Sequence, residues 1–155
     1  MKYKKYIGSP IYYNHQERVM VRHFKNLDIY KDSYTLSLEL YRLTDTFPLN
    51  AVSLRSQFRR AIFSTFLNIA EGSGKSSIKE YYYYVNIAYS SCRELVALVS
   101  FSCELGYIKP NSAETYLHKL DILSAKLFNF MKYLEKHDYK IKTAIKKYTY
   151  SRMIS

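Results

Sequence analysis

Hydrophobic positions recur every three or four residues along most of the chain, and this is the spacing of one face of an α-helix. A few helix breakers divide the middle of the chain into four such stretches: Pro48, Gly72 with Gly74, and Gly106 with Pro110. The connections between them are short, as in helix bundles. The pattern therefore predicts an all-α fold, an antiparallel up-down-up-down four-helix bundle.

Each stretch carries at least one apolar line that is expected to face the core. The first stretch, residues 24–47, has two lines: Leu27, Tyr30, Tyr34, Leu38 and Tyr41, and beside them Leu36, Leu40, Leu43 and Phe47. The second has Leu54, Phe58, Ala61, Thr65, Asn68 and Gly72. The third has Tyr84, Ala88, Ser91, Leu95, Leu98, Ser102 and Leu105, and the fourth has Leu117, Leu120, Leu127, Phe130 and Leu134.

Capping signals mark the expected helix ends. Asn50 is expected to cap the second helix, and capping boxes are expected at Ser77-x-x-Glu80 and Asn111-x-x-Glu114. Gly72 and Gly106 lie where left-handed C-terminal caps would fall.

Several short motifs on these helices form a recognisable set. Phe24-x-x-Leu27 opens the first helix and Phe47-Pro48 closes it. The second helix carries Leu54-x-x-Gln57-x-Arg59-Arg60-Ala61-x-x-Ser64 and Asn68-Ile69-Ala70-Glu71-Gly72, and the third carries Ala88-x-x-Ser91-x-x-Glu94-Leu95 and Leu105-Gly106-Tyr107-Ile108. Over residues 24–135 the chain resembles the four-helix bundle proteins encoded by intervening sequences of 23S ribosomal RNA genes, also called S23 ribosomal proteins. It is also similar to the accessory variability determinant of diversity-generating retroelements.

The resemblance implies an assembly as well as a fold. Members of this group look like homopentameric barrels, and the retroelement branch binds nucleic acid and a reverse transcriptase. By resemblance, a homo-oligomer with RNA or DNA as partner is expected, with a reverse transcriptase or a ribosomal component as a possible protein partner. Family membership indicates the fold far better than the activity.

Charge is concentrated at the two ends of the chain. The formal net charge is +11; residues 1–23 carry five basic residues and one acidic residue, and residues 136–155 carry six and one. The sequence therefore predicts a basic N-terminal extension, 1–23, a bundle, 24–136, and a basic C-terminal extension, 137–155, in which residues 139–150 keep helical spacing. Such ends either improve solubility or bind polyanions. The expected nucleic-acid-binding residues are Lys2, Lys4, Lys5, Arg18, Arg22, Arg55, Arg59, Lys75, Lys79, Lys140, Lys142, Lys146, Lys147 and Arg152.

A set of polar residues shares one face across the second and third helices: Gln57, Arg60, Ser64, Asn68, Glu71, Ser91 and Glu94. They form either a ligand site or a structural network between helices or protomers, and we favour the network, with Arg60 paired to Glu71 or Glu94. The nearby Gly72-Ser73-Gly74-Lys75-Ser76 resembles the end of a P-loop, but Ile69 replaces the first glycine and no strand precedes it.

Catalytic and metal-binding motifs are missing from the sequence. Cys92 and Cys103 are eleven residues apart on one helix, about 16 Å along its axis, which is too far for a disulfide or shared metal. The four histidines have no ligand spacing. The sequence predicts a non-enzymatic protein without a cofactor or metal. The two cysteines favour a reducing, cytoplasmic location, and no apolar run approaches the roughly 20 residues needed to cross a membrane.

Tyrosine is unusually frequent, with 18 tyrosines and no tryptophan. Tyr81, Tyr82, Tyr83 and Tyr84 fill about one helical turn, so they cannot all face one core. We assign Tyr84 to the core line. The others suit a subunit contact or, less readily, base stacking.

Overall fold

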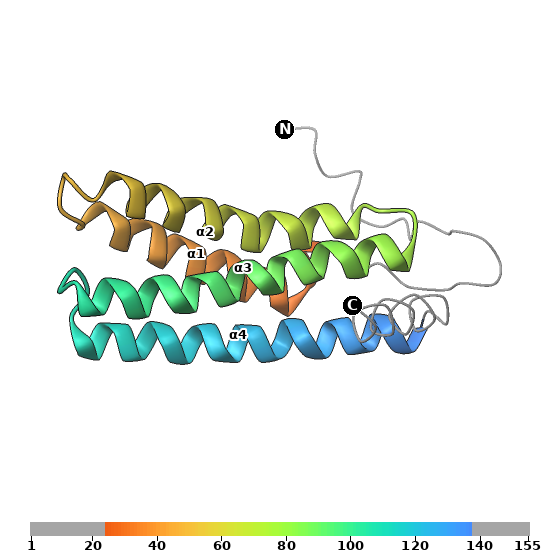
Figure 1. Cartoon of the computed structure of the whole chain (residues 1–155). Coiled ribbons are helices and arrows are strands. Elements are labelled where there is room, and N and C mark those ends of the chain that lie inside the picture. Colours follow the sequence, from red (N-terminus) through yellow and green to blue (C-terminus); the bar gives the residue numbers. More distant parts are fainter. Residues whose placement is uncertain (1–23, 138–155) are drawn as a thin grey trace, which may run out of the picture.

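The computed structural model describes residues 24–137, which form four helices around one core, each running antiparallel to the next along the chain (Figure 1). A short 3-10 turn, Phe24–Asn26, precedes α1, Asp28–Asp45. The other helices are α2, Val52–Ser73, α3, Ile78–Glu104, and α4, Pro110–His137. The four-helix bundle predicted from the apolar spacing is confirmed. Residues 1–23 and 138–155, including the predicted helical stretch 139–150, lie outside the described residues.

Cross-helix contacts fix how the helices are aligned. Lys119 Nζ lies 2.6 Å from Glu39 Oε2, and Lys126 Nζ lies 2.6 Å from Asp32 Oδ2, so α1 and α4 run antiparallel. α1 consequently starts in the half of the bundle that holds the α2–α3 connection and the end of α4, although it begins short of that end (Figure 1). The other two connections lie at the opposite end. Within residues 24–137, no helix is both long and apolar enough to cross a membrane.

Only one of the two apolar lines of α1 enters the core. Leu36, Leu40 and Phe47 of the second line are buried, and burying one such side chain contributes about 1.5–3 kcal/mol. In the first line Tyr34 and Leu38 are 44% and 42% exposed. The two lines occupy different faces of α1: the face that carries Leu36 and Leu40 is turned inward, whereas Tyr30 and Tyr41 of the first line are partly buried and pack against the core from its edge.

The predicted N-terminal caps divide into one that is confirmed and two that are wrong. Ser77 caps α3: its Oγ accepts from the Glu80 backbone N–H at 3.2 Å and donates to Glu80 Oε2 at 2.7 Å. Asn50 does not cap α2, because the residue before that helix is Ala51, which makes no side-chain cap. Asn111 lies inside α4, which begins at Pro110. Proline suits a first helical position because it has no N–H to leave unpaired.

The two predicted glycine caps also differ. Gly106 has a φ of +73°, its N–H bonds to the Cys103 carbonyl at 2.9 Å, and the Tyr107 N–H bonds to the Ser102 carbonyl at 2.9 Å. These two bonds form the Schellman motif, so this cap is confirmed.

Gly72 has a different role from the predicted cap. It lies inside α2, where a Cβ atom would stand 2.7 Å from Cδ2 of Tyr81 and 2.8 Å from Cβ of Tyr84. Glycine is needed here because α3 approaches too closely for any side chain.

Candidate functional site

Arg55, one of the predicted nucleic-acid-binding residues, holds the α1–α2 connection together. Its Nε donates to the Thr44 carbonyl at 3.1 Å, and its Nη2 donates to the carbonyls of Phe47 and Pro48 at 2.8 and 2.9 Å. The last carbonyls of a helix have no partner within the helix, and Arg55 supplies one from α2. Its guanidinium therefore serves the fold through these three bonds, and its assignment to nucleic-acid binding stays a prediction.

The other predicted cations of the bundle differ in how far they are paired. Arg59 Nε donates to Thr44 Oγ1 at 2.9 Å, its Nη2 pairs with Asp45, and its guanidinium lies 4.2 Å from the centre of the Tyr41 ring. Lys79 is exposed and has no ion pair within residues 24–137. The remaining predicted cations lie outside the described residues: Lys2, Lys4, Lys5, Arg18, Arg22, Lys140, Lys142, Lys146, Lys147 and Arg152.

The predicted polar residues of α2 and α3 form a hydrogen-bonded seam between the two helices. Gln57 donates through Nε2 to Glu94, and Arg60 Nη2 donates to Gln57 Oε1 at 2.7 Å. The predicted pairing of Arg60 with Glu71 or Glu94 was therefore wrong, because the Gln57 amide lies between guanidinium and carboxylate. An amide can do this because it offers a donor and an acceptor together.

Further along the seam the contacts involve hydroxyl groups. Ser64 Oγ lies 2.7 Å from Ser91 Oγ, and Asn68 Nδ2 donates to the Ser64 carbonyl at 2.7 Å and to its Oγ at 3.2 Å. The polar atoms of the seam thus bond to one another, an arrangement typical of a structural network.

A small charged cluster closes the seam beside the α2–α3 connection. Lys75 Nζ lies 3.2 Å from Glu71 Oε1 and 4.4 Å from the centre of the Tyr84 ring. Hydrogen bonds from Lys75 and Tyr84 lower the pKa of the Glu71 carboxyl, and bonds to Tyr84 and Glu71 raise the pKa of Lys75. The lysine of the P-loop-like segment is thus paired with a carboxylate near the end of the preceding helix, α2.

The four consecutive tyrosines have distinct surroundings. Tyr81 is the buried one, at 4% exposed, and its ring packs edge-on against Phe130 with centroids 5.4 Å apart. The assignment of Tyr84 to the core line was wrong, because the space left by Gly72 admits Tyr81 instead, while Tyr84 is half-buried. Tyr83 is 60% exposed. Burial raises the pKa of Tyr81, whose hydroxyl has no hydrogen-bond partner in the described part of the chain.

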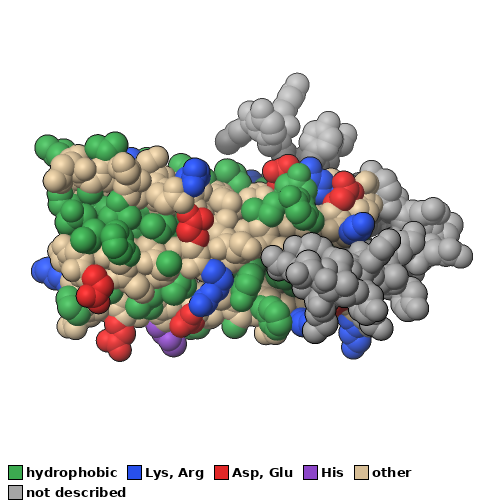
Figure 2. Space-filling view, in the orientation of Figure 1, with side chains coloured by type: hydrophobic (Ala, Val, Ile, Leu, Met, Phe, Trp, Pro, Cys, Tyr) green, Lys and Arg blue, Asp and Glu red, His purple; other side chains and the backbone are tan. Residues whose placement is uncertain are grey.

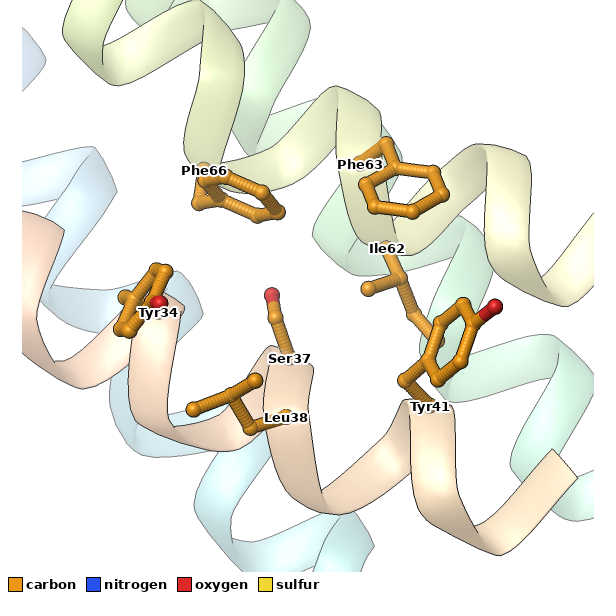
Figure 3. A pocket seen from close by; sticks show the side chains of 7 residues that line it. All are labelled: Tyr34, Ser37, Leu38, Tyr41, Ile62, Phe63 and Phe66. Carbon is orange, nitrogen blue, oxygen red and sulfur yellow. The ribbon is translucent and has the colours of Figure 1, made fainter. Parts of the chain in front are cut away.

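A cavity of about 280 Å³ opens between α1 and α2, and sequence reasoning missed it. Figure 3 shows aromatic rings from both helices around its rim. We call it the aromatic cavity, and its lining residues are Tyr34, Ser37, Leu38, Tyr41, Ile62, Phe63 and Phe66. The available signal was that α1 carries two apolar lines, one more than a bundle core requires, and the line of Tyr34, Leu38 and Tyr41 is the one that lines this cavity.

Neither cysteine forms part of a site in the described structure. Both are free, Cys92 being buried and Cys103 half-buried, and burial raises the pKa of the Cys92 thiol. Within residues 24–137 no group of three or more His, Cys, Asp or Glu side chains is arranged to hold a metal ion.

Comparison with known proteins agrees with the bundle described above. A family model described as 23S rRNA-intervening sequence protein matches residues 25–129. A comparison with curated proteins gives no match. The matched range begins at the turn before α1 and ends within α4, so it covers most of the helical bundle and leaves both basic ends outside.

Proposed function

The chain belongs to the 23S rRNA-intervening sequence protein family, and from that premise we propose that it is a non-enzymatic, oligomeric protein that binds nucleic acid in the cytoplasm. RNA is the expected ligand, since the description of the family names 23S rRNA. The observation that carries the proposal is the +11 net charge and its concentration in the two ends of the chain. Cationic segments bind nucleic acid through its phosphates, with little dependence on sequence.

The arrangement of the helices supports a single basic surface. α1 starts in the same half of the bundle in which α4 ends (Figure 1), so the two points where the basic extensions join the described helices lie toward one end. Residues 1–23 and 136–155 together carry +9 of the formal charge. Assembly of several copies would multiply this charge and strengthen binding to one polymer.

Exposed apolar side chains support the oligomer. Val52 at the start of α2 and Phe101 near the end of α3 are 63% and 55% exposed, and Leu49 and Leu105 beside them are 89% and 45% exposed. Figure 2 shows hydrophobic surface gathered at this end of the bundle. Large exposed apolar patches mark protein interaction sites. The family resemblance favours an assembly of five copies of the chain. Light scattering of the full chain measures this number, and a monomer at all concentrations would refute the proposed oligomer.

The non-enzymatic part of the proposal rests on the seam. Its polar atoms are bonded to one another across α2 and α3, as the Gln57–Glu94 and Ser64–Ser91 contacts show. A catalytic constellation would also present a reactive group to a substrate cavity, whereas the aromatic cavity is lined by residues that lie outside the seam. Turnover of a substrate that is abolished by Arg60→Ala or Glu71→Gln would overturn this part.

Two charge-matched variants of the full chain test nucleic-acid binding. In one, Lys140, Lys142, Lys146 and Lys147 become Gln; in the control, four exposed bundle lysines, Lys25, Lys31, Lys109 and Lys132, become Gln. We expect the first variant to bind single-stranded RNA more weakly than the control, with a shallower dependence of affinity on salt. Equal losses would assign binding to overall basicity, and an unmodified chain that binds no RNA or DNA at low salt would refute the proposal.

A second candidate function is a scaffold for another protein, such as a reverse transcriptase or a ribosomal component. The apolar patch at Val52 and Phe101 favours it, since that patch would suit a partner as well as a second copy. A partner that remains bound after nuclease treatment would support this function. The DNA around the gene for this chain also distinguishes the two candidate functions. A position inside a 23S rRNA gene favours nucleic-acid binding, and an adjacent reverse transcriptase gene favours the scaffold.

A further inference from the structure

We propose that the aromatic cavity between α1 and α2 binds one base of a single-stranded nucleic acid. This inference rests on the proposed nucleic-acid binding and adds a second kind of contact to it. The charged ends would hold phosphates, and the aromatic cavity would hold a base.

The walls of the cavity are aromatic rings joined in a chain. Tyr34 of α1 packs edge-on against Phe66 of α2 with centroids 5.6 Å apart, Phe66 contacts Phe63 at 6.1 Å, and Phe63 contacts Tyr41 at 5.9 Å. These contacts hold the rings in place around an open centre (Figure 3). Stacking on such rings suits any base, because every base has a flat π-face.

A hydroxyl group without a partner points into this apolar space. Ser37 is only 5% exposed, and Figure 3 shows its side chain directed into the centre of the cavity. Its Oγ makes no hydrogen bond among residues 24–137, whereas the Oγ of Ser33, one turn earlier on α1, donates to the Tyr30 carbonyl at 2.9 Å. This free hydroxyl can donate to or accept from a molecule in the cavity, which favours a ligand with polar edges over an aliphatic one.

The volume of the cavity and a nearby cation further restrict the kinds of ligand that would fit. At about 280 Å³ the cavity is just below the range of drug-sized ligand pockets, so it suits one ring system. Arg42 follows Leu38 by one helical turn, is exposed, and has no ion pair among the described residues. A cation at this position suits the phosphate attached to a bound base.

The test compares a short single-stranded RNA with an abasic chain of the same length, each titrated into the full-length protein. Phe63→Ala removes one wall, and Ser37→Ala removes the hydroxyl while keeping a good helix former. The matched control is Phe128→Ala on α4, because Phe63 and Phe128 are both 45% exposed. We expect RNA binding to weaken about tenfold for Phe63→Ala and about threefold for Ser37→Ala, with no change for Phe128→Ala. All variants should bind the abasic chain equally.

Each other outcome has a distinct meaning. If the unmodified chain binds the abasic and intact RNA equally, or if Phe63→Ala and Phe128→Ala behave alike, the aromatic cavity is not a base site while nucleic-acid binding stands. If neither probe binds, the proposed function fails and this inference fails with it. If Phe63→Ala changes the particle mass in light scattering and Phe128→Ala does not, a second copy covers the cavity and the base site is overturned.

Discussion

Gly72 is the position where a single methyl group should disturb the bundle most. Replacing it with alanine places a Cβ 2.7 Å from the Tyr81 ring and 2.8 Å from Tyr84 Cβ, closer than real Cβ contacts come. The Tyr81 ring cannot move aside easily because it is buried, and Tyr84 Cβ moves only with the backbone of α3. The ends of α2 and α3 therefore have to separate.

The expected cost follows from two opposing terms. Overpacking of this kind costs about 1–3 kcal/mol. Alanine regains up to about 1 kcal/mol of helix propensity over glycine, and less here because Gly72 is the second-last residue of α2. We expect Gly72→Ala to lower the free energy of unfolding by about 1–2 kcal/mol.

Urea unfolding of the full chain, followed by far-UV circular dichroism at one fixed protein concentration, measures this loss. The control is Gly74→Ala, whose Cβ meets only the Glu71 carbonyl at 3.5 Å, so it should be neutral or slightly stabilising. Gly106→Ala meets no atom within 4 Å but keeps a φ of +73°, so it should lose about 1–2 kcal/mol through backbone strain alone. A Gly72→Ala variant as stable as Gly74→Ala would refute the close-approach argument.

Three further predictions concern capping, pH and thiol reactivity. Ser77→Ala should cost about 1 kcal/mol in urea unfolding, whereas Asn50→Ala should change little, since only Ser77 makes a cap bond; equal losses would contradict this. Hydrogen bonds from Ser77 lower the pKa of Glu80 in the folded state, so this contribution to stability is present above its ordinary pKa of 4.5 and is lost as the pH falls below it. Glu80→Gln should therefore show a smaller loss of stability on acidification than the unmodified chain, and an identical pH profile would count against it. Ellman's reagent should modify half-buried Cys103 before buried Cys92, whose pKa is raised, and mass spectrometry after partial labelling would reveal the opposite order.

The sequence was sufficient for the order and type of the helices because those depend on local signals. Pro48, Gly106 and the Ser77 box each mark a helix end through the chemistry of a few adjacent residues. The family could be identified for a similar reason, since its motifs are short and contiguous. Gly72 illustrates the limit: glycine near a helix end indicates a cap, and only the position of α3 shows that it serves a close approach instead.

Pairing between side chains was much harder to predict. Arg55 looks like any exposed cation in the sequence, but the end of α1 and the connection after it bring three carbonyls within reach of its guanidinium. Arg60 looks like the partner of a carboxylate until Gln57 lies between them. The aromatic cavity was hidden because the Tyr34 line of α1 has the spacing of core residues, and periodicity alone cannot say which of two faces is turned inward.

The two ion pairs between α1 and α4 have a consequence for how the chain folds as it is made. Glu39 and Lys119 are 80 residues apart, and Asp32 and Lys126 are 94 apart, whereas the contacts between α2 and α3 join residues much nearer in sequence. During synthesis α2 and α3 can pair while α4 is still being translated, and α1 meets its last partner only when the end of α4 has emerged. The side of the bundle between α1 and α4 is therefore the last to close on a nascent chain.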